Sequence, residues 1–136
     1  MTALEKYWAR RKCSALARAV VIRCTQTNPH RSMYGLHGVQ IHPEWVIDTE
    51  AFAQYLMALP GCYDQTLVLD RIDNDGHYVP GNLRFVTNAE NCRNNSHTAL
   101  HPPLYDEEAL HRLLDIRRCR KNEKIGKANR SDECVA

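Results

Sequence analysis

Three oxygen-bearing side chains have the types and the spacing of a metal site. Asp70 lies late in an apolar stretch with the pattern of a β-strand, and Asn91 and Asn95 lie four residues apart in a predicted helix soon after it. Since residues four apart share one face of a helix, a strand carboxylate and two amide oxygens can converge on one cation. Oxygen ligands suit a hard ion such as Mg²⁺ or Mn²⁺ better than zinc. An ion held in this way could polarise a phosphate ester and stabilise its leaving oxygen.

The same residues also fit a purely structural interpretation. Asp70 could pair with Arg84, and Asn91, Asn94 and Asn95 could form an ordinary polar face of a helix. Their joint occurrence at the spacing that a metal site needs favours one divalent ion, Mg²⁺ or Mn²⁺, as the cofactor. A structural zinc is not expected, because none of the six cysteines forms a CxxC pair.

The elements that would position these side chains are two strands and a capped helix. Residues 66–72 have the pattern of a strand, and residues 74–76 (Asn-Asp-Gly) have turn chemistry. Residues 83–86 predict a second short strand. A helix is expected to begin at Thr87, because Glu90 three residues later completes a capping box.

Helices are expected on both sides of this segment. The longest spans residues 4–24, where no Gly or Pro interrupts the helical spacing. Asp48 can cap a second helix with an apolar stripe over residues 52–59, and the acids at 106–108 can open a third. Residues 39–41 are expected to form a short strand. The pattern predicts a small α+β domain.

Charge is distributed unevenly, although the formal net charge is only +2. Residues 1–30 contain six Lys or Arg and one acid, residues 117–130 contain seven and one, and the middle of the chain is richer in acids. Basic ends around a carboxylate-rich centre suit a polyanion such as DNA, gripped on both sides of a metal site. Solvated helix faces are the alternative that charge alone leaves open.

Composition also restricts the class of protein. A chain of 136 residues is enough for one domain with a modest core. No apolar run reaches transmembrane length, and the basic N-terminus lacks an apolar secretory segment, so we expect no membrane partner and a cytoplasmic location. The scattered cysteines fit free thiols in a reducing compartment.

The segment from Leu69 to Asn95 resembles the ββα-metal motif of HNH endonucleases. More narrowly, it is similar to the phage and prophage subgroup whose core reads LDRIDNDGxYxPxNxRxVTxxEN, with little departure. Upstream, the run from Tyr34 to Val39 and the following Trp45 resemble that subgroup's Tyr-Gly-rich loop and tryptophan. The resemblance extends over about residues 14–96. It implies a ββα-metal (HNH, or His-Me finger) core with flanking helices.

The resemblance implies roles for residues at matching positions. Asp70 matches the metal ligand of the first strand, and Asn82 matches the central asparagine, which pins the loop between the strands by hydrogen bonds. Asn91, nine residues later, matches the last histidine of the motif, here replaced by asparagine, and Asn95 matches an additional ligand position. Arg71 departs from the usual pattern, because the position after the first ligand usually holds the histidine that deprotonates water.

Arginine cannot act as a base at ordinary pH, so Arg71 is expected to clamp a phosphate or to stabilise developing negative charge. His77, near the turn, is then the nearest candidate base, with a solvent-exposed turn histidine as the alternative. Arg84 and Arg93 in the motif, and Arg31 in the upstream loop, are candidates for contacts with DNA phosphates.

These interpretations divide the chain into four segments: a basic N-terminal helix (1–30), an HNH-like ββα-metal domain (31–100), a C-terminal helix (101–120) and a basic, disordered tail (121–136). The expected activity is divalent-metal-dependent endonucleolytic hydrolysis of DNA phosphodiester bonds, by nicking or by double-strand cleavage. The alternative is a DNA-binding module without cleavage, or a phage packaging accessory, on the same scaffold. DNA is the expected partner, and a second copy of the chain in a homodimer and a phage terminase are further candidates.

Overall fold

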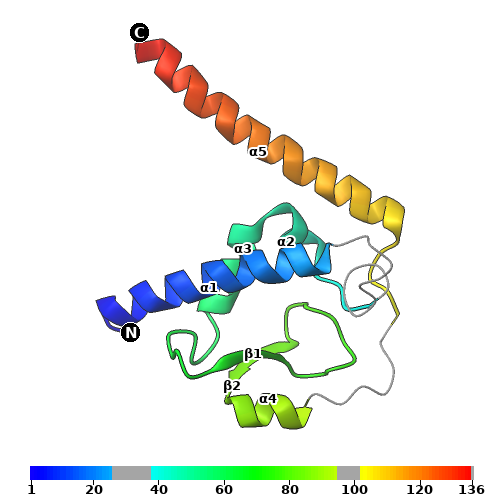
Figure 1. Cartoon of the computed structure of the whole chain (residues 1–136). Coiled ribbons are helices and arrows are strands. Elements are labelled where there is room, and N and C mark those ends of the chain that lie inside the picture. Colours follow the sequence, from blue (N-terminus) through cyan, green and yellow to red (C-terminus); the bar gives the residue numbers. More distant parts are fainter. Residues whose placement is uncertain (26–37, 95–101, 136) are drawn as a thin grey trace.

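The computed structural model describes residues 1–25, 38–94 and 102–135, the last range with side chains as far as Glu123. Within these residues the chain forms five helices and one two-stranded sheet, so the expected α+β class is confirmed (Figure 1). In chain order the elements are α1 (Ala3–Cys24), α2 (Pro43–Ile47), α3 (Thr49–Met57), β1 (Val68–Arg71), β2 (Leu83–Val86), α4 (Asn88–Asn94) and α5 (Glu107–Val135). None of the described helices is long and apolar enough to cross a membrane.

Helix α1 forms one side of the hydrophobic core. Thr2 caps it, because its hydroxyl accepts a hydrogen bond from the Glu5 backbone N–H at 3.1 Å. The buried side chains recur at helical spacing and pack against α3. They are Ala9, Cys13, Ala17, Val20, Val21 and Cys24. The predicted helix over residues 4–24 is therefore confirmed, and its buried face forms part of the core.

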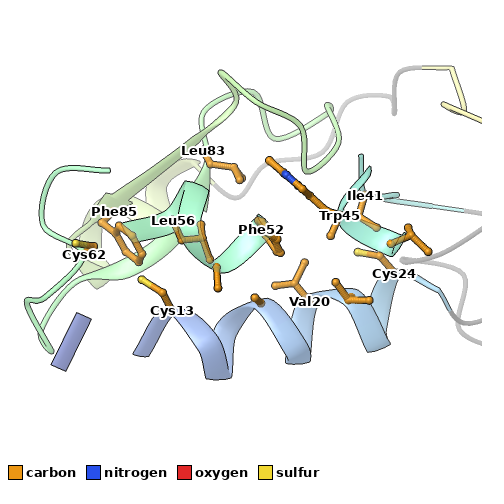
Figure 2. Packing of buried hydrophobic residues seen from close by; sticks show 14 of the residues in the cluster. Cys13, Val20, Cys24, Ile41, Trp45, Phe52, Leu56, Cys62, Leu83 and Phe85 are labelled. Atoms are coloured by element: carbon orange, nitrogen blue, oxygen red, sulfur yellow. The ribbon is translucent and has the colours of Figure 1, made fainter. Parts of the chain in front are cut away.

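Aromatic stacking joins α2 to α3 in the middle of the core. Trp45 lies nearly parallel to Phe52, with ring centroids 4.4 Å apart and an interplanar angle of 19° (Figure 2). Asp48 caps α3 as expected, since its Oδ1 accepts a hydrogen bond from the Ala51 N–H at 3.3 Å. The single turn of α2 was not expected, because Pro43 was interpreted as the end of a strand. Proline is favourable in the first turn of a helix, where its missing N–H has no intrahelical partner.

The two strands form an antiparallel hairpin that lies between α1 and α4 in Figure 1. Its register pairs Leu69 with Phe85 and Asp70 with Arg84. Phe85 belongs to the core on the α1 side, where the Lys12 ammonium lies 4.7 Å from its ring centroid. Because successive side chains of a strand point to opposite faces, Asp70 and Arg84 point to the face that α4 covers. The second strand has the predicted bounds, whereas the first is shorter than residues 66–72.

A buried polar cluster ties together segments that are far apart in the sequence. Where a strand over residues 39–41 was expected, the structure has isolated bridges, one of them parallel between Ile41 and Tyr78. Beside it the Gln40 side chain, 1% exposed, accepts a hydrogen bond from Leu104 N–H at 2.7 Å and donates one to the Tyr105 carbonyl at 3.1 Å. The Tyr105 hydroxyl donates to the Ile41 carbonyl at 2.9 Å. These bonds satisfy an amide that would be costly to bury without partners.

Helix α5 begins where expected and ends later than expected. Asp106 caps it, because its Oδ1 accepts a hydrogen bond from the Ala109 N–H at 2.8 Å. The helix contacts α2 and then extends away from the rest of the domain (Figure 1). We expected disorder from about Lys121, whereas the structure is helical through Val135. Lys, Glu, Arg and Ala in this stretch favour a helix, and its single glycine lowers helix stability by only about 1 kcal/mol.

Buried thiols should make the fold less stable in alkaline solution. Burial raises the pKa of the Cys24 thiol from 9.0 to about 12. Within this pH range the unfolded chain loses a proton that the folded chain keeps. The contribution of Cys24 to the free energy of unfolding should therefore be constant below pH 9.0 and should decrease above it, by up to about 1.4 kcal/mol per pH unit. Urea unfolding below and within this range measures the fall, and Cys24→Ala should reduce it. An unchanged slope in Cys24→Ala would contradict this explanation.

Candidate active site

Asp70 occupies the centre of the face between the hairpin and α4. Its side chain is 5% exposed, and its Oδ2 accepts a hydrogen bond from the Arg84 Nε–H at 3.0 Å. Arg84 is its partner on the opposite strand, so the register of the hairpin creates this ion pair. The Asn94 amide approaches from α4, with its Nδ2 at 3.3 Å from Oδ1 and 3.1 Å from Oδ2. The carboxylate is thus held by one neighbour from each of the other two elements.

Asn94 is the residue that sequence reasoning missed. Besides Asp70, its Nδ2 contacts the Arg71 carbonyl at 2.7 Å, so the last residue of α4 is fastened to the end of β1. Asn91 lies three residues earlier and therefore on the same face of the helix, partly buried. Within the described residues its side chain has no hydrogen bond to Asp70, and Asn95 lies outside those residues. The sequence signal that could have found Asn94 is its position at the end of the helix that follows the hairpin. From that position a side chain can reach the end of the first strand.

Arg71 is used inside the hairpin. Its Nη1 donates to the carbonyls of Asn74 at 2.5 Å and Gly76 at 2.6 Å, and its Nη2 donates to Asn74 Oδ1 at 3.2 Å. Its guanidinium also lies 5.6 Å from the centre of the Tyr78 ring. Three N–H groups are thus used by the turn, so Arg71 stabilises the Asn-Asp-Gly segment. The expected role as a phosphate clamp stays a prediction, because a guanidinium has five N–H donors.

His77 is buried rather than exposed on the turn. Its side chain is 4% exposed, and its Nδ1 accepts a hydrogen bond from the Gln40 backbone N–H at 2.9 Å. Because a backbone N–H only donates, the ring proton lies on Nε2, which donates to the Pro102 carbonyl at 3.0 Å. Both ring nitrogens are therefore engaged, and no lone pair is left to accept a proton from water. The interpretation of His77 as a candidate base is corrected to a structural role beside the polar cluster of Gln40.

Asn82 fixes the loop between the strands. Its Oδ1 accepts a hydrogen bond from Asp73 N–H at 2.8 Å, and its Nδ2 donates to the carbonyls of Asp73 at 3.2 Å and His77 at 2.9 Å. The preceding Gly81 has a φ of 89°, which favours glycine, and its N–H donates to the Tyr55 hydroxyl at 2.7 Å. These contacts are those expected of a side chain that pins the loop, and they give Asn82 a positioning role.

The arginines expected to contact DNA have different surroundings. The Arg84 side chain is 43% exposed, so it can pair with Asp70 through Nε while part of its guanidinium faces solvent. Arg93 is exposed on α4. Arg31 lies outside the described residues. Two of the three expected arginines are therefore exposed to solvent, and one of them, Arg84, pairs with Asp70.

A hard divalent cation fits the donor chemistry around Asp70. No group of three or more His, Cys, Asp or Glu that could hold a metal occurs among the described residues. Mg²⁺ does not require such a group, since it commonly binds one or two carboxylates and keeps several waters. Asp70 Oδ1 has only the longer contact to Asn94, whose Nδ2 is held by the Arg71 carbonyl at 2.7 Å, so the Asn94 Oδ1 could reach the same ion only if this side chain left that carbonyl. Asp70 and Asn94 are thus the pair that could hold the ion, with Asn91 on the same helix face.

Comparisons with known proteins identified no relative of this chain. The chain matches no protein-family model, and no similar curated protein or solved structure was found.

Proposed function

We propose that this protein is a divalent-metal-dependent DNA endonuclease with an HNH-type ββα-metal centre. One observation carries the proposal: a buried strand carboxylate, Asp70, and an amide from the following helix, Asn94, lie within hydrogen-bond distance. The two residues belong to β1 and α4, which are the first and last elements of a strand–strand–helix unit. The motif that resembles the phage and prophage subgroup covers this same unit.

In this proposal the residues around Asp70 have separate tasks. Asp70 and Asn94 would hold Mg²⁺ or Mn²⁺, which supplies Lewis-acid stabilisation to a phosphodiester undergoing hydrolysis. The accessible part of Arg84 would bind a phosphate oxygen beside them, and exposed Arg93 would contact the DNA backbone. Asn82 keeps the loop in place, so that β1 and β2 present Asp70 and Arg84 together.

A second candidate, a DNA-binding module or packaging accessory without cleavage, is favoured by a different observation. Both oxygens of Asp70 already have protein partners, and Arg71 and His77 are engaged in internal hydrogen bonds. A site in which Asp70 serves only the ion pair with Arg84 would hold the hairpin against α4 and leave the arginines to bind DNA. Cleavage and binding are distinguished by one experiment.

The test is relaxation of supercoiled plasmid by the purified protein in Mg²⁺ or Mn²⁺, with EDTA as the metal-free arm. We expect nicking that EDTA stops. Asn94→Ala should slow it by at least about 10- to 100-fold, because even the loss of a group that only orients a metal ligand has effects of this size. Asn88→Ala, at an exposed asparagine in the first turn of the same helix, is the matched control and should retain most of the activity. Plasmid binding without nicking in either metal would support the binding module.

A further inference from the structure

The outer face of α1, opposite its buried face, carries aromatic and basic side chains. Tyr7, Arg11 and Arg18 follow one another at intervals of four and seven residues, and Trp8 lies beside them. Tyr7 is 49% exposed and Trp8 is 43% exposed. Large aromatic side chains of this kind are usually buried, and here they lie on the side of the helix that faces away from the core.

A shallow groove of about 520 Å³ runs along this face. Its lining includes Trp8 and Arg18, the small side chains of Ser14 and Ala15, which lie between them in the helix, and Gln65 from the loop before β1. The other lining residues are cations, Arg10, Arg11 and Lys12. Because Arg11 and Arg18 are seven residues apart, they lie roughly 10 Å apart along the helix axis.

Most of the positive charge of this groove has no carboxylate partner in the described part of the chain, although Lys12 lies close to Asp64. Four of its lining residues are cations and none is an acid. Lys12 is used within the fold, because its ammonium donates to the carbonyls of Asp64 at 2.5 Å and Leu67 at 2.7 Å. In the described part of the chain, Arg10 and Arg18 pair with no carboxylate. Their charge is therefore available to an anionic partner.

The aromatic side chains are held in place beside these cations. The Tyr7 ring packs edge-on against Trp8 with centroids 5.2 Å apart. The Arg11 Nη1 donates to the Tyr7 hydroxyl at 2.9 Å, and the guanidinium lies 5.7 Å from the centre of the Tyr7 ring. Trp8 is thus supported from one side and exposed on the other, as a stacking surface requires.

We propose that this groove binds a segment of single-stranded nucleic acid, with an unpaired base on Trp8 and phosphates on Arg11 and Arg18. Exposed aromatic rings among unpaired cations are the chemistry by which proteins hold single strands, since every base has a face that can stack. A duplex offers its phosphates but hides the base faces, and an acidic peptide offers charge without a flat ring. The combination of Trp8 with the arginines therefore favours an unpaired strand.

This groove is separate from the centre around Asp70. The α1 side of the hairpin carries Phe85, and the opposite side carries Asp70 beneath α4. The proposal therefore goes beyond the nuclease function and can be tested without cleavage. Binding in EDTA is independent of cleavage, and the variants at Trp8 and Arg18 show how much of it comes from the α1 groove.

The test is fluorescence anisotropy of a labelled oligothymidylate titrated with the full chain in EDTA. Trp8→Ala should weaken binding about 10-fold, and Trp8→Phe should restore most of the affinity because a ring is still present. Arg18→Gln should weaken binding and lower the slope of log K against log salt by about 0.7, the change expected for one phosphate contact on a single strand. The matched control is Arg112→Gln on α5, a side chain 71% exposed that pairs with Glu108 outside the groove, which should leave the slope unchanged.

Tryptophan emission provides a second readout. The chain has two tryptophans, and Trp45 is only 4% exposed, so quenching by the oligonucleotide should come from Trp8 and disappear in Trp8→Phe. The proposal is overturned if Trp8→Ala binds the single strand like the wild type. It is also overturned if a duplex of equal length binds more tightly than the single strand, or if polyglutamate competes as well as the oligonucleotide does.

Discussion

Asp70→Asn should abolish metal-dependent nicking of plasmid DNA, with a loss of at least about 1000-fold. The substitution keeps the size of the side chain and an oxygen for Arg84, but it removes the only carboxylate that the strand contributes to the candidate site. Stabilisation of a phosphate by a bound cation is worth several kcal/mol, and each 1.4 kcal/mol corresponds to tenfold in rate. Initial rates of conversion of supercoiled to nicked plasmid in Mg²⁺ and Mn²⁺ measure the loss.

The control for this variant is Asp115→Asn on α5. That carboxylate is 71% exposed, makes only a 3.9 Å contact with Arg118, and should be dispensable for nicking. Thermal unfolding of both variants shows whether lost activity is lost folding, because Asp70 also joins the hairpin to α4. If Asp70→Asn folds and nicks at the wild-type rate, Asp70 is only the structural partner of Arg84 and the nuclease proposal is wrong.

Asn82→Ala should lower the free energy of unfolding by about 2–3 kcal/mol. The variant loses three side-chain hydrogen bonds to the backbone of Asp73 and His77, each worth about 1 kcal/mol when partly exposed. Because these bonds close the loop that joins the two strands, nicking should also decrease. Urea unfolding gives the stability change, and the plasmid assay at a temperature where the variant is folded gives the second effect.

The same change at Asn88 provides the comparison. Asn88 is exposed in the first turn of α4, and within the described residues its side chain makes no hydrogen bond. Asn88→Ala should therefore change the free energy of unfolding by less than about 0.5 kcal/mol. Equal stability losses in the two variants would mean that the loop contacts of Asn82 contribute nothing particular to the fold.

Local patterns in the sequence predicted most of the elements. The hairpin strands, the caps at Asp48 and Asp106 and the core face of α1 all depend on residues close together in the chain. Such signals act through backbone hydrogen bonds and side-chain periodicity, which need no knowledge of the rest of the molecule. The short helix α2 was missed because a proline such as Pro43 is compatible both with the end of a strand and with the first turn of a helix.

The candidate site was predicted less completely, because its details depend on tertiary contacts. Asp70 could be singled out by its place late in a strand, but the choice among Asn91, Asn94 and Asn95 depends on how α4 packs on the hairpin. His77 looked like an accessible turn residue because its partner Gln40 is 37 residues away in the sequence. The Arg71 donors could not be assigned either, since the path of the turn determines which carbonyls they reach.

The bonds around Gln40 set a limit on how the chain can be divided. A fragment ending near residue 100 would contain the whole hairpin and α4, yet it would lack Pro102, Leu104 and Tyr105, the acceptors and donors that His77 and Gln40 require. It would also lack Leu110, which is fully buried. We therefore expect that the hairpin and α4 do not fold as an excised module, and that the shortest autonomously folding piece continues through the first turn of α5.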